Sequence, residues 1–489
     1  MQFAITHIRY AIIAKVLGVL LMLFSLTLLT PMLISFIYHD EQIIPFAIAF
    51  AVTFCTGLLV WLPAAQVKQD LRVKDGFLVV SLFWFVLGVF GALPFILSTI
   101  GSLDVTDAIF ESISGLTTTG ATVITGIDEL PKSILYYRQQ LQWLGGIGII
   151  VIAVAILPML GIGGMQLYRA ETPGPVKDSK LTPRITETAK ALFLIYVSLT
   201  IICMLAYWAV GMTLFDALGH AFSTVAIGGF STHDASMAYF NSNKVLLVSI
   251  VFMLLAGMNF ALHFMAWRQK NVKQYFADPE WRFYMKMTAI GCTVVACGLY
   301  FMNVYDIEHA LVLGSFKLVS IMTTTGFGVA DFSMWPSFLP VFIFMFAFMG
   351  GCAGSTGGGL KMIRVMLIIK QGAREIKRLI HPNAVIPIKL GAQKIPGRIV
   401  DAVWGFVAAY LLLYFVMVII MMATGLDFLS AFSAVGAAIN NLGPGLGDVA
   451  ANFQNVSDVG KWTLCFAMLL GRLEVFTLLV LFTPTFWKQ

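Results

Sequence analysis

A short loop that is polar or rich in glycine occurs four times in this 489-residue chain, at residues 117–122, 226–231, 323–328 and 440–445. Each copy lies between two long apolar segments, and successive copies are about one hundred residues apart. Recurrence of one loop type at a regular interval is typical of a fold built from repeated units. We therefore expect four equivalent loops to gather around one axis.

The composition predicts a polytopic membrane protein. Hydrophobic residues make up 59% of the chain and charged residues 11%, too few charges to cover a soluble protein. The net charge of +6 is spread over loops that flank apolar segments, which argues against nucleic-acid binding. The apolar run 16–37 is too long for a cleaved signal sequence, so we expect it to stay as a spanning helix. All six cysteines lie in apolar segments, which indicates neither a disulfide framework nor a zinc site.

The apolar segments have two length classes. A spanning helix needs about 20 apolar residues, and the segments that meet this length are 14–37, 44–65, 76–99, 138–165, 190–212, 243–267, 285–303, 338–370, 402–424 and 460–482. Shorter apolar segments lead directly into the four loops, at 107–116, 216–226, 308–322 and 427–439. These are too short to span, so we predict that they are re-entrant half-helices.

This order predicts an all-α fold in which a unit of helix, half-helix, loop and helix occurs four times around a pseudo-fourfold pore. The expected units are 67–168, 169–270, 271–372 and 373–489, and residues 1–66 add two further N-terminal transmembrane helices. The second helix of each unit carries glycine at a matching depth, at Gly145, Gly257, Gly350 and Gly471. Small residues at these positions suit close packing of helices.

Basic residues predict the orientation of the chain in the membrane. Of the 31 lysines and arginines, 25 fall on one side of the expected spans, in the N-terminal segment, the loops 66–75, 168–190, 268–286 and 361–398, and at Lys488. The positive-inside rule places these loops and both termini in the cytoplasm, so the four glycine loops enter the membrane from outside. The outer side carries 15 acidic residues by the same sorting. Such a negative surface concentrates cations.

Four loops that converge on an axis would present rings of backbone carbonyl oxygens, which replace the hydration shell of a small cation. Glycine suits this role because it adopts backbone conformations closed to other residues. The hydroxyl groups of Thr118, Thr119, Thr324 and Thr325 would add oxygens at the inner end. No carboxylate lies within the loops, which favours a weakly held monovalent cation over a divalent one. The alternative is four ordinary turns, but each of the four loops follows a half-helix.

Taken together, the motifs at 114–122, 220–231, 323–328 and 440–445 resemble those of the membrane subunit of TrkH/TrkG potassium-uptake systems. These systems belong to a superfamily with KtrB and the plant HKT transporters. The resemblance covers the whole chain and includes the two additional N-terminal helices. It implies a multi-pass potassium-uptake protein of the bacterial inner membrane, without enzymatic activity.

The resemblance also implies a selectivity filter made of three residues from each loop, with potassium bound there. These residues are Thr118, Thr119, Gly120, Ile227, Gly228, Gly229, Thr324, Thr325, Gly326, Asn441, Leu442 and Gly443. In the family, serine at the first filter glycine accompanies sodium permeation, so Gly120 favours potassium. The four loops are unequal and none reads as the TVGYG of simple potassium channels, so strict exclusion of sodium is not predicted.

Residues 350–361 interrupt the second helix of the third unit. Six glycines within ten residues cannot hold a stable helix, because each costs about 1 kcal/mol relative to alanine. The spacing misses the phosphate-binding motif GxxxxGK, and no strand precedes it. We interpret the segment as a movable plug, and the resemblance implies an intramembrane gate beneath the filter. Its candidate gating residues are Gly351, Gly354, Gly357, Gly358, Gly359 and Lys361.

Arg472 lies inside the last expected span, where an isolated charge is expensive. One alternative is a local pair with Glu474 or a side chain that reaches an interface. Residues two apart point to different faces of a helix, so we favour an Arg472 that faces the pore and repels cations when the plug is closed. The resemblance agrees, since the family has a basic residue near the constriction. Of other polar residues in the half-helices, we expect Lys317 to lie at the surface or between helices, His220 to be structural, and Glu111 to support the filter.

The basic loop 370–398 has two candidate roles, contact with solvent or lipid headgroups and docking of a cytoplasmic regulator. The resemblance implies a TrkA-like ring that binds NAD(H) and adenine nucleotides, and a homodimer of this chain. The chain has no nucleotide fingerprint, so any nucleotide would be bound by the partner.

Two other classes of protein remain as alternatives. An ion-coupled secondary transporter would need acidic residues at membrane depth, and Glu474 is the clear candidate. An intramembrane enzyme would need clustered His, Asp or Cys, which His263 and the scattered cysteines do not supply.

Overall fold

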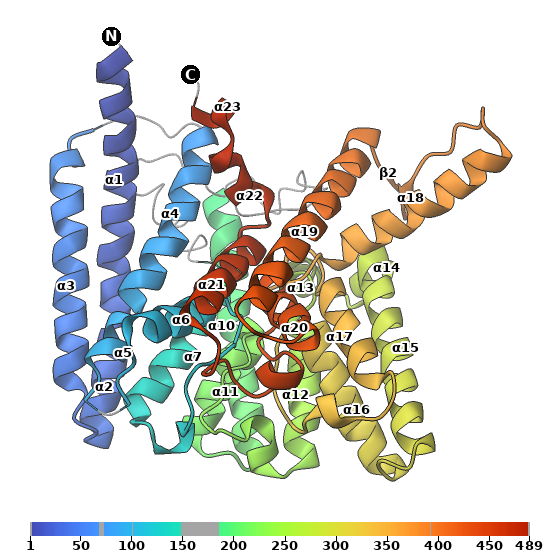
Figure 1. The fold of residues 1–489 in the computed structure, drawn as a ribbon, viewed down its shortest axis with the longest axis horizontal. Coiled ribbons are helices and arrows are strands. Elements are labelled where there is room, and N and C mark those ends of the chain that lie inside the picture. Colours follow the sequence, from blue (N-terminus) through green and yellow to red (C-terminus); the bar gives the residue numbers. More distant parts are fainter. Residues whose placement is uncertain are drawn as a thin grey trace.

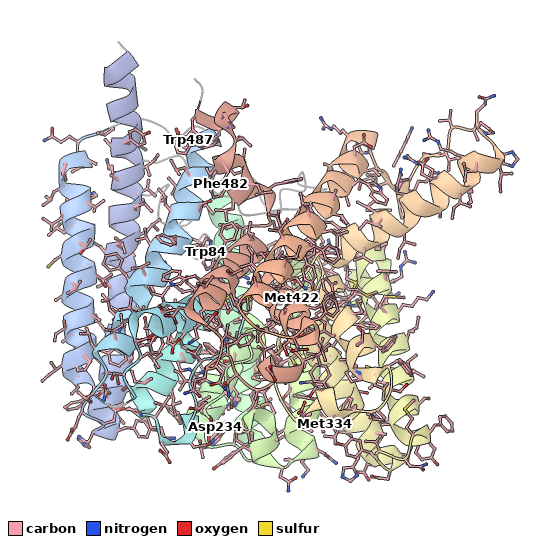
Figure 2. All side chains as sticks on the ribbon, in the orientation of Figure 1. Trp84, Asp234, Met334, Met422, Phe482 and Trp487 are labelled. Atoms are coloured by element: carbon pink, nitrogen blue, oxygen red, sulfur yellow. The ribbon has the colours of Figure 1, made fainter. Side chains whose placement is uncertain are left out.

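The computed structural model describes residues 2–67, 73–99, 101–146, 148, 185–391 and 393–487. These parts are almost entirely helical (Figure 1), and a short antiparallel hairpin joins β1 (Lys389–Leu390) to β2 (Gln393–Lys394). Most helices run between two faces of the molecule. Both termini lie at one face, here called the terminal face, and Asp234 and Met334 lie toward the opposite face (Figure 2).

The N-terminal part is a pair of long helices at one side of the molecule. It consists of α1 (Gln2–Thr27), α2 (Leu29–Tyr38), α3 (Ile43–Trp61) and the 3-10 turn η1 (Leu62–Ala64). At the contact between α1 and α3, Gly18 and Gly57 face each other so closely that a Cβ on either would lie under 3 Å from the other's carbonyl oxygen. Small residues thus allow these helices to touch along their backbones.

The rest of the chain repeats one order of elements four times. Unit 1 contains α4 (Val73–Gly91), α5 (Leu93–Leu97), α6 (Val105–Leu116), η2 (Ile127–Glu129) and α7 (Lys132–Gly146). Unit 2 contains α10 (Ile185–Ala209), α11 (Leu214–Ala226), η3 (Ser236–Phe240), α12 (Asn243–Ala256), α13 (Phe260–Gln269) and α14 (Lys273–Ala277). Unit 3 contains α15 (Pro279–Phe301), α16 (Ile307–Met322), η4 (Phe332–Met334), α17 (Leu339–Met349) and α18 (Met362–Ile380). Unit 4 contains α19 (Gly397–Ala423), α20 (Phe428–Ile439), η5 (Gly447–Val449), α21 (Asp458–Arg472), α22 (Phe476–Leu479), η6 (Val480–Phe482) and α23 (Pro484–Trp487).

The predicted half-helices are confirmed as α6, α11, α16 and α20, each of 12 to 16 residues. Polar residues fix where three of them begin: the side chains of Asp104, Thr213 and Asp427 accept hydrogen bonds from backbone N–H groups in the first turn. Such caps satisfy donors that the helix itself leaves unpaired. Their inner ends are almost wholly buried, as expected for re-entrant helices surrounded by protein.

The units close into a ring by one packing rule. The second helix of each unit contacts the half-helix of the next, so that α7 packs on α11, α12 on α16, α17 on α20, and α21 returns to α6. The backbone also closes the ring, since the N–H of Phe453 in unit 4 donates to the carbonyl of Thr122 in unit 1 at 2.8 Å. The largest cluster of buried apolar side chains accordingly joins the N-terminal helices to units 1 and 4.

The prediction of a single helix is wrong for two of the spans. The segment 243–267 is bent by 92° between α12 and α13, and 460–482 is bent by 106° between α21 and α22. In the first, Asn259 caps a new helix just after Gly257; in the second, Glu474 and Val475 adopt left-handed φ angles of 51° and 39°. Both breaks, like the end of α7 at Gly146 and of α17 before Gly350, fall at the matched glycines.

Six single helices in the described parts are long and apolar enough to cross a membrane, and the two bent pairs raise this to eight. They correspond to the predicted spans apart from two. The span 338–370 is split by the glycine-rich segment, as its sequence indicated, and most of 138–165 lies outside the described residues. The same holds for half of the basic loop 66–75, for most of the loop 168–190, for the expected boundary at residue 168, and for Lys488.

Candidate functional site

The four loops share one backbone conformation. The first predicted filter residue of each, Thr118, Ile227, Thr324 and Asn441, is left-handed with φ between 53° and 64°. Two residues later, the glycine of each loop has a φ between 79° and 100°. Glycine adopts this region without the steric cost that a Cβ brings. The loops are thus equivalent in shape although their side chains differ.

Each loop is tied to its own half-helix by the same hydrogen bond. The N–H of the middle residue (Thr119, Gly228, Thr325 or Leu442) donates at 2.8 Å to the carbonyl of a residue five positions earlier (Ser114, Ser223, Ser320 or Ala437). The N–H of the middle residue is therefore paired with the half-helix of its own unit. Its carbonyl is directed away from the half-helix, toward the neighbouring loop.

The loops meet in a closed cycle. A Cβ placed on Gly120 would lie 1.9 Å from the carbonyl oxygen of Gly228, and one on Gly229 would lie 2.0 Å from that of Thr325. A Cβ on Gly326 would lie 2.0 Å from the oxygen of Leu442, and one on Gly443 would lie 2.7 Å from that of Thr119. The glycines and the middle residues of the four loops therefore form one closed ring, in which each glycine faces a carbonyl of the next unit.

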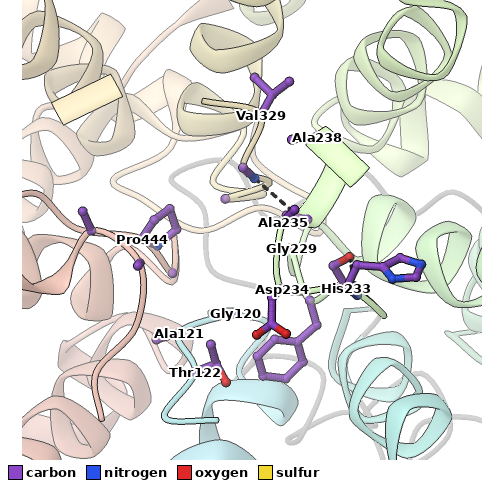
Figure 3. A pocket seen from close by; sticks show the side chains of 18 of the residues that line it. Gly120, Ala121, Thr122, Gly229, His233, Asp234, Ala235, Ala238, Val329 and Pro444 are labelled. Atoms are coloured by element: carbon purple, nitrogen blue, oxygen red, sulfur yellow. Dashed lines mark hydrogen bonds between the residues drawn. The ribbon is translucent and has the colours of Figure 1, made fainter. Parts of the chain in front are cut away.

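A cavity of about 360 Å³ opens on one side of this ring, and Gly120, Gly229, Gly326 and Gly443 all line it. Figure 3 shows the cavity surrounded by segments of units 1 to 4, coloured cyan, green, yellow and red. Charged residues in its wall are Arg138, Asp234, Lys317 and Asp331. In the figure, a dashed line marks the 3.1 Å bond from the Gly328 N–H to Ser236 Oγ, which joins the third loop to unit 2.

A buried ion pair supports the first loop. Glu111, fully buried in α6, accepts a 2.8 Å hydrogen bond from Arg138 and further bonds from Thr122 and the N–H of Val123. Arg138 also donates to the carbonyl of Ser231 in the second loop at 3.2 Å. Glu111 therefore supports the loop as expected. The sequence gives no sign that Arg138 meets this acid, because the two side chains lie in different helices.

Two histidines of unit 2 make polar contacts beside the loops. His220 bonds the carbonyl of Asp216 at 2.8 Å and Ser231 Oγ at 2.9 Å, which makes it structural as expected. His233, which the sequence interpretation missed, contacts the carboxylate of Asp128 in unit 1. Burial raises the pKa of Asp128, but hydrogen bonds from His233 and the N–H of Asp234 outweigh this, and the net pKa lies below the ordinary value of 3.8.

Side chains at the inner end of the ring are mostly occupied by the scaffold. The hydroxyl groups of Thr119 and Thr325 bond to those of Thr117 and Thr323, at 2.7 and 2.8 Å. The hydroxyl of Thr324 instead accepts the N–H of Gly358 at 2.7 Å. Backbone carbonyls, rather than these hydroxyls, are thus the oxygens available to an ion at these positions.

Lys317 is buried between helices and not at the surface. It is 2% exposed, and its ammonium group lies 4.4 Å from the ring of Phe332.

A second cavity, of about 130 Å³, lies on the terminal side of the ring. Trp84 lines it, and Figure 2 shows Trp84 nearer the terminal face than Asp234, which lines the first cavity. Of the residues predicted to gate, Gly354, Gly357, Gly358, Gly359, Lys361 and Arg472 line this cavity. Gly351 lies beside Gly257, where a Cβ would be 3.0 Å from its carbonyl oxygen.

The glycine-rich segment packs directly beneath the third and fourth loops. The N–H of Gly359 donates to the carbonyl of Asn440 at 3.1 Å, and a Cβ on Gly358 would lie 2.0 Å from the same oxygen. Thr356 reaches further, donating to the carbonyl of Val225 in unit 2 at 2.9 Å. The segment therefore touches units 2 and 4 from its place in unit 3.

Arg472 lies at the end of α21 and points across the axis. Its guanidinium donates to Thr118 Oγ1 and the carbonyl of Thr356, both at 3.3 Å, and to the carbonyls of Gly145 and Gly146. Glu474 pairs with Arg364 in α18. Arg472 thus joins the first loop, the glycine-rich segment and the end of α7.

Comparison with known proteins identifies the family of this architecture. The model of the TrkH family, described as cation transport protein, matches residues 42–489. The chain belongs to the TrkH family. As a cation transport protein with apolar helices of spanning length, it is a multi-pass membrane protein and not an enzyme.

Curated relatives cover nearly the whole chain. It is 57% identical over 477 residues to the Trk system potassium uptake protein TrkH of Halomonas elongata, covering 98% of this chain and 99% of the relative. It is 39% identical over 485 residues to TrkG of Escherichia coli strain K12, covering 99% of both. The crystal structure of the potassium transporter TrkH from Vibrio parahaemolyticus superposes with a TM-score of 0.89 at 52% identity, covering all of both chains. The fold and its four units are therefore those of the family.

Proposed function

We propose that this protein carries potassium into the cell through a channel-like pore on the axis of the ring. The relatives named above are potassium uptake proteins, and the high identity over their full length supports the same substrate here. The observation that carries the proposal is the cycle of four glycines, each within contact of a carbonyl from the next loop. Rings of carbonyl oxygens can replace water around a monovalent cation.

In this proposal the twelve loop residues form the selectivity filter, and the cavity of about 360 Å³ is its entrance. Potassium is the transported substrate and is held only by oxygens of the filter. Residues 350–361 and Arg472 form the gate on the terminal side. A guanidinium across the pathway opposes a cation by charge, and the segment beside it narrows the cavity to about 130 Å³.

The terminal face is the cytoplasmic face of the inner membrane, because the described basic loops 268–286 and 361–398 lie on that side. The basic end of α18 and the loop after it would then meet a TrkA-like nucleotide-binding ring, and two copies of the chain would form a homodimer. An ion-coupled transporter receives less support. Its candidate acid Glu474 is paired with Arg364, and such a pair does not readily exchange protons.

The test is cation flux into liposomes that contain the purified protein, comparing potassium with sodium. Gly120→Ser places a side chain where the carbonyl of Gly228 now lies, so it should widen or distort the ring. We expect the ratio of potassium to sodium flux to fall in the variant. Equal ratios in the variant and the unchanged protein would refute the assignment of these loops as the filter.

A further inference from the structure

One buried carboxylate, that of Glu280, contacts the backbone at two positions, one within the glycine-rich segment and one just after it. Oε1 of Glu280 accepts a hydrogen bond from the N–H of Ala353 at 2.7 Å and another from the N–H of Ile363 at 3.1 Å. Glu280 belongs to the first turn of α15 and is 8% exposed. A single oxygen atom of a different helix therefore holds two backbone positions that are ten residues apart.

The chain between these two positions depends on outside contacts for its shape. It contains Gly354, Gly357, Gly358 and Gly359, and the first and last of these have φ angles of 74° and 73°. Glycines lose more conformational freedom on ordering than any other residue, so a stretch rich in them stays ordered only where its surroundings fix it. Oε1 of Glu280 supplies one such contact at each end of the stretch.

Charged neighbours also connect Glu280 with the segment. Burial of a carboxylate is costly unless hydrogen bonds and opposite charge compensate for it. Lys361, which lies inside the segment and donates to the carbonyl of Gly357, attracts the carboxylate electrostatically, while Asp278 repels it. The cation that offsets the charge of Glu280 is thus part of the segment that Glu280 holds.

We propose that Glu280 is a positioning residue for the gate. Its carboxylate holds residues 353–363 in the conformation that narrows the pore, and its loss shifts the segment toward conformations in which the cavity is wider. This inference rests on the proposed function, in which the segment obstructs the pathway. It predicts that the closed state depends on a side chain outside both the filter and the segment.

Cys352 is a native reporter for this equilibrium. It precedes Ala353, is 2% exposed, and its N–H donates to the carbonyl of Gly257 at 2.8 Å. In a chain whose other five cysteines are replaced by serine, the rate at which a water-soluble maleimide labels Cys352 measures how often the segment leaves its place. A role of Glu280 in folding alone would not change this rate in folded protein.

We expect Glu280→Ala to raise the labelling rate at least about tenfold, since two hydrogen bonds are lost and each contributes about fivefold to an equilibrium constant. Glu280→Gln keeps an acceptor oxygen of the same shape without its charge, so it should give a smaller increase. Glu308→Ala is the matched control, because Glu308 is an exposed residue in the first turn of α16 and does not touch the segment. Its labelling rate should equal that of the parent chain.

Labelling at the parent rate in folded Glu280→Ala overturns the inference. If that variant does not fold, the same result in Glu280→Gln overturns it. Potassium flux into liposomes separates this inference from the proposed function. Faster labelling of Glu280→Ala without faster potassium flux supports the positioning role of Glu280 and refutes the proposed gate. Unchanged labelling of Glu280→Ala, together with a raised flux in Arg472→Ala, refutes the positioning role and retains the proposed gate.

Discussion

The loops around the axis and the helix breaks beneath them differ in how closely the four units agree. All four loops have the same pair of left-handed residues and the same 2.8 Å bond to the half-helix. The breaks have little in common beyond their glycines. The chain turns by 92° after α12 and by 106° after α21, and a twelve-residue glycine-rich segment, 350–361, follows α17.

In the proposed function, this difference separates what the selection of a cation requires from what the gating of the pore requires. A cation surrounded by carbonyls needs oxygens from every side, so each unit must place its loop alike. An obstruction needs to enter the pathway from one side only. In the proposed gate, units 3 and 4 supply it, as the glycine-rich segment and Arg472, while unit 1 supplies acceptor carbonyls at Gly145 and Gly146.

The largest effect is expected from breaking the symmetry of the ring. Gly229→Ala would place a methyl group 2.0 Å from the carbonyl oxygen of Thr325 and adds a left-handed strain of about 1–2 kcal/mol. We expect nearly complete loss of potassium flux in liposomes. Gly425→Ala is a matched control, because Gly425 also has a positive φ, of 104°, with no atom within 4 Å of the added group. Equal flux in the two variants would contradict a filter built from these contacts.

A smaller effect, a rise in potassium flux, is expected at Arg472, which has no equivalent in the other units described in the structure. Arg472→Ala removes the guanidinium that joins Thr118, Thr356 and the end of α7, so the leak of potassium through liposomes should rise several-fold. Arg472→Lys keeps the charge and should raise the leak less. An unchanged leak in Arg472→Ala would show that this charge does not limit permeation.

The smallest effect is expected at the contact between Asp128 of unit 1 and His233 of unit 2. Asp128 has a pKa below 3.8, so its carboxylate stabilises the folded protein above that pH, and this contribution disappears as the pH falls through the lowered pKa. Asp128→Asn should therefore lower the melting temperature slightly at pH 7, and the difference from the unchanged protein should shrink as the pH falls below 3.8. A difference that does not change with pH would assign the effect to packing instead of charge.

The sequence predicts most of the ring because its signals are local. Length separates half-helices from spans, and glycine marks each loop, so α6, α11, α16 and α20 are found within two residues of their ends. The bends are not predicted, because a glycine within an apolar helix also suits simple packing. Gly257 gives no sign that Asn259 will cap a new helix, and nothing local indicates positive φ at Glu474.

Partners across units are the other part that sequence does not predict. Arg364 in unit 3 and Glu474 in unit 4 are 110 residues apart, so only the packing of the units brings them together. The same holds for His233 and Asp128. These contacts depend on how units pack, whereas the loops depend on their own few residues.

The packing of α21 on α6 has a consequence for how the protein is made. Because units follow one another along the chain, unit 4 is synthesised after units 1 to 3, and only then can Phe453 reach Thr122. Gly443 and Arg472 both belong to unit 4. If the proposed function holds, a nascent chain therefore cannot close its filter ring before the unit that carries the gating arginine is being made.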